Sequence, residues 1–197
     1  MQKNQTLSEI TGFTEITPSA DISAARHGGR AKCLQRLVRL DMPVPPTVAL
    51  DFDAVHGISA GEMPDLAAML ALFGPDPLVS VRPSSEDPDW GGPGAILNIG
   101  MTDALHARLV ESHGEPAANA LYLRFIQAYA VHVARLDPDE FEAVAEPTAE
   151  ALSKALQTYE AETDERFPQD PKVQLGEVLR SMARAWEGTT ARLLREA

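Results

Sequence analysis

The spacing of apolar residues changes near Gly100, and this change limits the folds that the chain can adopt. Before Gly100, short β-branched runs alternate with helical spacing, whereas the three- and four-residue spacing of amphipathic helices predominates after it. Residues 78–82 and 95–100 are typical of buried strands. We therefore predict an α+β chain. An α/β subdomain over residues 1–101 holds a small mixed sheet that includes residues 78–81 and 95–100, and a helical subdomain covers residues 102–197.

Shorter signals place the remaining elements. Residues 10–16 and 47–50 have the composition of short strands, and helical spacing follows Gly29 and spans residues 66–73. Several elements end at proline, because proline lacks the amide donor and disfavours a helical residue before it. In the second part Thr102 is placed to cap a helix, and further helices are expected over residues 117–136, 147–163 and 171–196.

The charge of the chain excludes one class of partner. Its 29 acidic and 17 basic residues give a formal charge of −12 at pH 7. A phosphate backbone would be repelled over most of such a surface, so we expect no nucleic-acid partner. Any anionic ligand must instead bind where arginine and lysine are locally concentrated.

The residue types point to a cytoplasmic protein without a metal site of its own. The only cysteine, Cys33, leaves no intrachain disulfide, and its expected place is half-buried on a helix. The first residues lack the pattern of a signal peptide, and no apolar run reaches the ~18 residues that span a bilayer. The five histidines show no zinc-ligand spacing. We expect a soluble cytoplasmic protein with no membrane partner.

The first candidate site is the segment of residues 27–32 (HGGRAK), in which His27 precedes the glycine pair Gly28 and Gly29, and Arg30 and Lys32 follow it. Glycine lets backbone amides approach a ligand closely, a helix start presents unpaired N–H groups, and nearby cations neutralise phosphate. The alternative is a loop that needs glycine for its backbone angles, beside solvated charges. Taken alone, the motif favours that alternative, and it matches neither the P-loop nor the dinucleotide fingerprint.

The second candidate is Arg82, which ends the apolar run of residues 78–81. Such a strand delivers its last residue to the edge of the sheet, where α/β folds place ligands. A guanidinium group holds phosphate oxygens in a bidentate fork. The alternative, equally supported, is an arginine paired with Glu86 or Asp87.

The third candidate is the long loop between the two predicted strands. Its glycines Gly91, Gly92 and Gly94 allow it to fold over phosphates as a lid. A surface turn that binds no ligand has the same composition. Trp90 is placed to cover a base, although partial burial is the more frequent fate of a loop tryptophan.

Taken in order, six segments resemble motifs of the pyruvate, phosphate dikinase family, in the N-terminal part of its ATP-grasp nucleotide-binding domain, which is related to that of phosphoenolpyruvate synthase. Each motif is weak alone, but together they span nearly the whole chain. The segments are residues 28–34 (GGRAKCL, similar to GGKGANL), 40–46 (LDMPVPP, similar to GLPVPPGF), 78–82 (LVSVR, similar to SVRSGA), 95–100 (AILNIG, similar to TVLNLG), 122–127 (YLRFIQ, similar to YRRFIQ) and 167–171 (FPQDP, with Leu175 and Trp186 beyond it).

The resemblance implies ATP as the cofactor. In the family, the lysine of GGK and the arginine of SVR contact ATP phosphates, and these positions correspond to Arg30 and Arg82. The change to arginine keeps the charge but loses the compact ammonium, and Ala31 replaces a glycine. The family's Asp-Thr pair is absent from residues 89–95. The nucleotide-binding residues expected on this basis are Gly28, Gly29, Arg30, Lys32, Arg82, Gly91, Gly92 and Gly94.

The resemblance also implies an incomplete enzyme. In the family, a second ATP-grasp half carries the magnesium-binding carboxylates, and a phosphohistidine domain and a phosphoenolpyruvate-binding barrel follow. We expect an ATP-binding part of a kinase or transferase of this type, with no catalytic residue here. Mg²⁺ would bind only if a partner protein supplies the ligands, together with the second half and the phosphohistidine domain. The alternatives are a degenerate scaffold or regulatory protein that has kept the fold, and a fragment of a longer enzyme.

Overall fold

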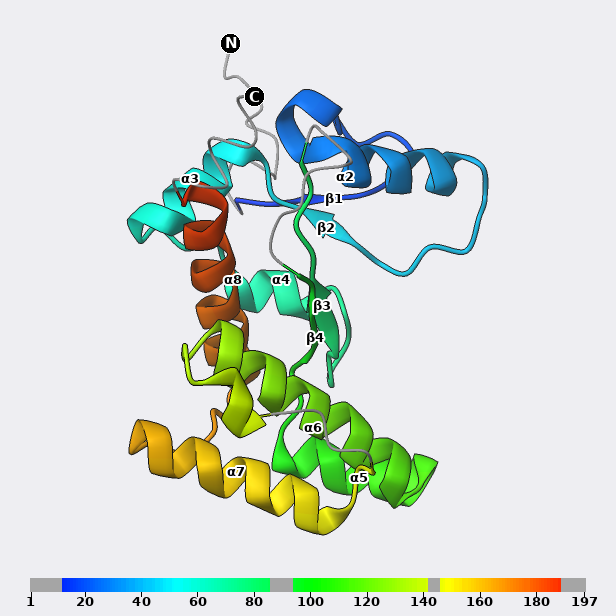
Figure 1. Cartoon of the computed structure of the whole chain (residues 1–197). Helices are drawn as coiled ribbons and strands as arrows, with labels where there is room; N and C mark the ends of the chain where they lie inside the picture. The colour runs from blue at the N-terminus through cyan, green and yellow to red at the C-terminus, as the bar shows by residue number, and fades with distance from the viewer. Residues whose placement is uncertain (1–11, 86–93, 142–145, 189–197) are drawn as a thin grey trace. The chain divides into compact units, whose positions relative to one another are not determined.

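The computed structural model describes residues 12–85, 94–141 and 146–188 (Figure 1). The chain forms two compact units that interleave along the sequence. Unit 1 takes its described residues from Met1–Phe73, Arg82–Gly94 and Met182–Ala197, and unit 2 takes them from Gly74–Val81 and Ala95–Ser181. The predicted division at residue 101 is a different partition of the chain, and it stays a prediction.

Unit 1 is built on a two-stranded sheet covered by a helix. Strands β1 (Thr14–Glu15) and β2 (Val48–Ala49) pair antiparallel. Helix α2 (Ala24–Arg39) lies along this pair (Figure 1), and its Ala31 joins Ile16, Ile22 and Ala49 in a buried cluster. Burial of this apolar surface is what fixes α2 on the sheet. The unit also contains α3 (Phe52–Ala60) and α4 (Leu66–Ala71).

Unit 2 combines a second strand pair with helices. Strands β3 (Val79–Val81) and β4 (Ile96–Ile99) pair antiparallel with one irregularity in the register. Helix α6 (Glu115–His132) packs against β4 and lies between α5 (Asp103–His113) and α7 (Ala149–Thr163) (Figure 1). The short helix η1 (Pro138–Phe141) also contacts α6. Helix α8 (Pro171–Glu187) begins in this unit, and its residues from Met182 onward belong to unit 1.

Local signals explain where several helices begin. The side chain of Thr102 accepts a hydrogen bond from the Leu105 N–H, and Thr148 accepts one from the Ala151 N–H. These caps satisfy backbone donors that a helix start leaves unpaired. Pro171 stands at the first position of α8, where its missing N–H has no partner to lose.

One buried side chain ties the end of β4 to α8 inside unit 2. Gln174 is fully buried, and its Oε1 accepts the Gly100 N–H at 2.8 Å. Its Nε2 donates to the carbonyl oxygens of Met101 at 2.8 Å and Pro168 at 2.6 Å. Gly100 has φ +106°, and a Cβ there would lie 1.9 Å from the Pro77 carbonyl oxygen. The backbone at Gly100 is therefore held by the hydrogen bond to Gln174 and by the close packing of the Pro77 carbonyl.

The α+β class is confirmed, and residues 78–81 and 95–100 lie in one sheet as predicted. The prediction that this sheet is mixed is wrong. The described strands form two separate antiparallel pairs. Strands this short carry no signal for their partners, since pairing depends on contacts distant in the sequence. After residue 102 the described residues contain only helices and connections, as predicted. Two details differ: α3 was not predicted, and α2 begins ahead of the glycine pair. Among the described residues no helix is long and apolar enough to cross a membrane.

Candidate functional site

The glycine pair lies at a kink inside α2. Gly28 has φ 80° and ψ 165°, while the residues on both sides are helical. A Cβ at Gly28 would lie 2.4 Å from the Ser84 Oγ and 2.5 Å from the Ser84 carbonyl carbon. Glycine is therefore required twice here, by the left-handed backbone angle and by the close approach of Ser84.

Three hydrogen bonds hold this kink against the segment that follows Arg82. The Gly29 N–H donates to the Ser85 carbonyl at 2.6 Å, and the Ala31 N–H donates to the Ser84 Oγ at 3.2 Å. The Arg30 Nη1 donates to the Pro83 carbonyl at 2.5 Å across 53 positions of sequence. We call this arrangement the Gly28 joint. It consists of residues 28–31 and 83–85, which all belong to unit 1.

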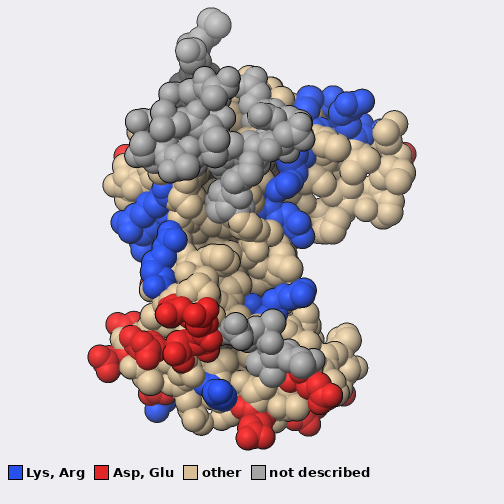
Figure 2. Space-filling view, viewed as in Figure 1, with Lys and Arg blue, Asp and Glu red and all other residues tan. Residues whose placement is uncertain are grey.

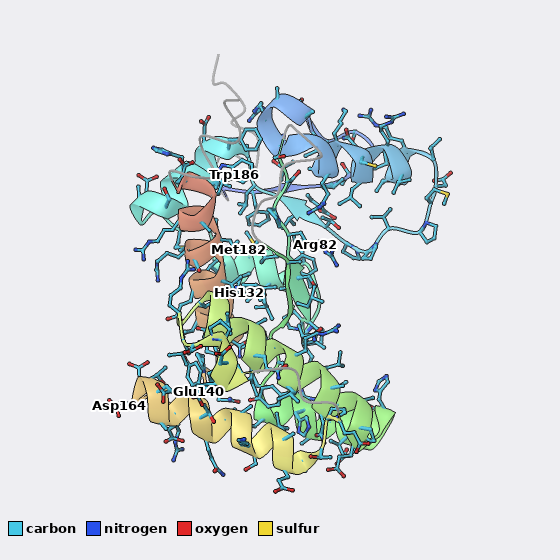
Figure 3. All side chains as sticks on the ribbon, viewed as in Figure 1. Arg82, His132, Glu140, Asp164, Met182 and Trp186 are labelled. Atoms are coloured by element: carbon cyan, nitrogen blue, oxygen red, sulfur yellow. The ribbon has the colours of Figure 1, made fainter. Side chains whose placement is uncertain are left out.

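The joint brings together the first two candidate motifs of the sequence. Arg30 belongs to the joint, and Arg82 directly precedes its second segment (Figure 3). Both side chains are exposed. The Arg82 side chain makes no hydrogen bond or ion pair with any residue that the structure describes. The alternative pairing with Glu86 or Asp87 lies outside the described residues.

Among the described residues, the helix that enters the joint carries a local excess of positive charge. Helix α2 contains five basic residues and no acidic one, and Figure 2 shows basic side chains over it. Arg26 is partly neutralised by Asp21 at 3.4 Å and Asp51 at 3.0 Å. A negatively charged chain therefore presents a basic surface at this helix, and such a surface attracts anions. The basic residues are Arg26, Arg30, Lys32, Arg36 and Arg39.

Lys32 has a supporting role within the unit. Its Nζ donates to the Ile22 carbonyl at 2.7 Å and to the Gln35 Oε1 at 3.0 Å. Gln35 is fully buried and donates to the carbonyls of Thr17 and Ala20. The ammonium group thus fixes the chain entering α2, and a role toward a ligand stays a prediction.

The structure adds detail at two residues that the sequence did not place among the nucleotide-binding residues, although His27 begins the first candidate segment. His27 is 3% exposed, and its Nδ1 accepts the Ser23 N–H at 3.4 Å. Burial lowers the pKa of His27 below its usual value, helped by the charge of Arg26 and opposed by Asp51 and Asp21. A neutral imidazole therefore packs beside the kink. The other residue is Ser84. The only feature of the sequence that pointed to it was its position two residues after Arg82.

The three loop glycines predicted as candidates make no described contact with the Gly28 joint. Gly91 and Gly92 lie outside the described residues. Gly94 is exposed, and no atom of another described residue lies within 4 Å of the place a Cβ would occupy. Within the described ranges no three His, Cys, Asp or Glu side chains are grouped as a metal site would require.

Comparison with known proteins gives a distant and partial similarity. No family model matches the chain. It is 30% identical over 136 residues to a pyruvate, phosphate dikinase of Clostridium symbiosum, which covers 59% of this chain and 16% of that protein. It is 24% identical over 199 residues to the chloroplastic pyruvate, phosphate dikinase of Mesembryanthemum crystallinum, covering 83% of this chain and 21% of that protein. The chain thus spans about a fifth or less of these relatives and is similar to one region of such phosphotransferases.

Proposed function

We propose that this chain binds the phosphates of ATP with Arg30 and Arg82, as the nucleotide-binding part of a phosphotransferase related to pyruvate, phosphate dikinase. The observation that carries this is the Gly28 joint. Its hydrogen bonds link the segments of the two arginines, although they are far apart in sequence. The similarity to two pyruvate, phosphate dikinases supports the same assignment.

In this site the side chains do most of the binding. The N–H groups of Gly29 and Ala31 already donate to Ser85 and Ser84, so they do not form a backbone cradle for phosphate. A guanidinium group has five N–H donors, and Arg30 uses one of them on the Pro83 carbonyl. The other donors of Arg30, and those of Arg82, are the groups we assign to phosphate oxygens. Lys32 and the glycines Gly91, Gly92 and Gly94 are secondary candidates.

The energies of such contacts predict weak binding. A hydrogen bond from a charged group contributes about 1.5–3 kcal/mol. Loss of translational and rotational freedom on association opposes this by roughly 4 kcal/mol or more. A net free energy of about −4 kcal/mol corresponds to a Kd of about 1 mM. We therefore expect millimolar affinity for ATP from this region alone.

Turnover would need further parts of an enzyme of this type. The relatives are about five times longer than the matched region or more. Phosphoryl transfer depends on metal ions that neutralise the transferred charge. We propose that Mg²⁺ and a phosphohistidine domain act from outside this region, on the same polypeptide or on a partner protein.

A second candidate function is a scaffold or regulatory protein that has kept the fold and lost the nucleotide. Two observations favour it. The family's lysine is replaced by Arg30, and the amides of the joint are occupied by the chain's own Ser84 and Ser85. In that case the glycines serve packing alone.

A titration of ATP followed by phosphorus NMR separates the two functions. We expect a Kd of about 1 mM for the wild type. In Arg82→Ala we expect about tenfold weaker binding or more, because a charge-assisted bond is lost. Arg124→Ala is the matched control, since Arg124 is an exposed arginine of unit 2 without a partner among the described residues. That variant should bind like the wild type.

Other outcomes of this titration contradict the site. Micromolar affinity that survives Arg82→Ala places the nucleotide elsewhere. Absence of any effect at high millimolar ATP supports the scaffold. A strong tightening by Mg²⁺ reveals metal ligands within this chain and contradicts the assignment of Mg²⁺ to another region.

A further inference from the structure

The end of α2 exposes apolar side chains beside basic ones. Leu40 is 71% exposed and Met42 is 52% exposed, which makes them the two most exposed large apolar side chains among the described residues. Arg36 and Arg39 lie in the last turn of the same helix. We call these four residues the α2 tip. Exposed apolar side chains grouped together and rimmed by charge are typical of an interaction site.

Unit 2 contains a groove of the opposite character. It has a volume of about 410 Å³ and lies between α6, η1 and α7. Apolar atoms of Leu123, Phe141, Ala151 and Ala155 line it, together with the carboxylates named next. Acidic side chains gather over unit 2 (Figure 2), and Glu140 of η1 can be located in Figure 3. The carboxylates that line the groove are Asp139, Glu140 and Glu150.

The charges of the tip and the groove are complementary. None of the three groove carboxylates forms an ion pair within the described part of the chain, and the Arg36 side chain has neither an ion pair nor a hydrogen bond there. Each surface carries one opposing charge, Asp41 beside the tip and Lys154 in the groove. The tip therefore stays net positive and the groove net negative, which favours their encounter.

We propose that two copies of this chain associate head to tail, with the α2 tip of one copy in the groove of the other. Leu40 and Met42 would contact the apolar lining, and Arg36 and Arg39 would face the carboxylates. Tip and groove are different surfaces, so the contact is heterologous and extends into a ring or an open chain. The tip contributes only four side chains to this contact, so we expect a weak association with a Kd on the order of 100 μM.

Two variants test this contact separately. The tip variant Leu40→Asp/Met42→Asp keeps an intact groove, and the groove variant Glu140→Lys/Glu150→Lys keeps an intact tip. All four positions are exposed, so both variants should keep the wild-type circular dichroism. Val173→Asp is the matched control, because Val173 is an exposed apolar residue of α8 outside both surfaces.

Sedimentation velocity over a range of concentrations gives the result. We expect concentration-dependent association of the wild type and of Val173→Asp, weakened several-fold in 0.5 M salt because screening reduces the charge attraction. Each double variant alone should be monomeric. Mixed together they should form a 1:1 dimer that grows no further, since only one tip and one groove remain intact.

Three outcomes overturn the proposal. They are a wild type that stays monomeric at 1 mM, a double variant that associates like the wild type, and a mixture that stays monomeric. None of the substituted residues belongs to the Gly28 joint, so these outcomes leave the nucleotide assignment untouched.

Discussion

Gly28→Ala is expected to destabilise unit 1 by roughly 2–5 kcal/mol. A left-handed backbone angle costs a residue with a Cβ about 1–2 kcal/mol, and the added atom would lie 2.5 Å from the Ser84 carbonyl carbon. Overpacking of this kind costs about 1–3 kcal/mol more. The neighbouring atom is backbone, so no rotation of a side chain relieves the overlap. The free energy of unfolding in urea measures the effect.

Two control substitutions at other glycines separate the backbone cost of Gly28→Ala from the cost of its overlap with Ser84. Gly61 has φ +107° with no atom within 4 Å of its Cβ position, so Gly61→Ala reports the backbone cost alone, about 1 kcal/mol. Gly94 has open space and an ordinary backbone angle, so Gly94→Ala should change stability by less than about 0.5 kcal/mol. If Gly28→Ala is no more destabilising than Gly61→Ala, Ser84 does not occupy the space that we assign to it.

Gln174→Leu is expected to destabilise unit 2 by roughly 3–5 kcal/mol. The amide of Gln174 satisfies the Gly100 N–H and the carbonyls of Met101 and Pro168. Leucine has a similar volume but no polar atoms, so three buried backbone groups lose their partner. Each such group costs about 1–3 kcal/mol, and partial hydration lowers the sum.

Gln157→Leu is the matched control for Gln174→Leu. Gln157 lies exposed on α7, where its Nε2 bonds the Ser153 Oγ and water can replace it. A change below about 0.5 kcal/mol is expected. Urea unfolding measured for both variants compares a buried and an exposed glutamine. Equal effects would contradict the role of Gln174 as the link between β4 and α8.

The helices were predictable because their signals are local. Thr102 and Thr148 cap the helices that they precede, and Pro171 begins the last one. The strands were recognised from composition, and residues 78–81 and 95–100 were correctly placed in one sheet. The division into two antiparallel pairs was not predicted, because pairing depends on residues distant in the sequence. Helix α3 lacked the clear apolar spacing of its neighbours, so its Asp51 cap was overlooked.

The candidate site was predictable only in its outline. The sequence places Gly28 and Arg82 in two separate motifs, and only the structure links the segments through Pro83, Ser84 and Ser85. A glycine pattern does not tell whether a ligand or the chain itself fills the space beside it. At Gly28 that space is filled by Ser84. The sequence placed His27 at the start of the first motif but gave it no role, because burial of an isolated histidine leaves no trace in the sequence.

The central claim is that the two segments that meet at the Gly28 joint, one carrying Arg30 and the other following Arg82, form one phosphate site. Amide chemical shifts recorded during a titration with ATP test it most directly. We predict shifts in residues 28–32 and 82–85 that follow a single Kd of about 1 mM and become much smaller in Arg82→Ala. Shifts confined to one segment, different apparent Kd values for the two, or shifts located only in unit 2 would contradict the claim.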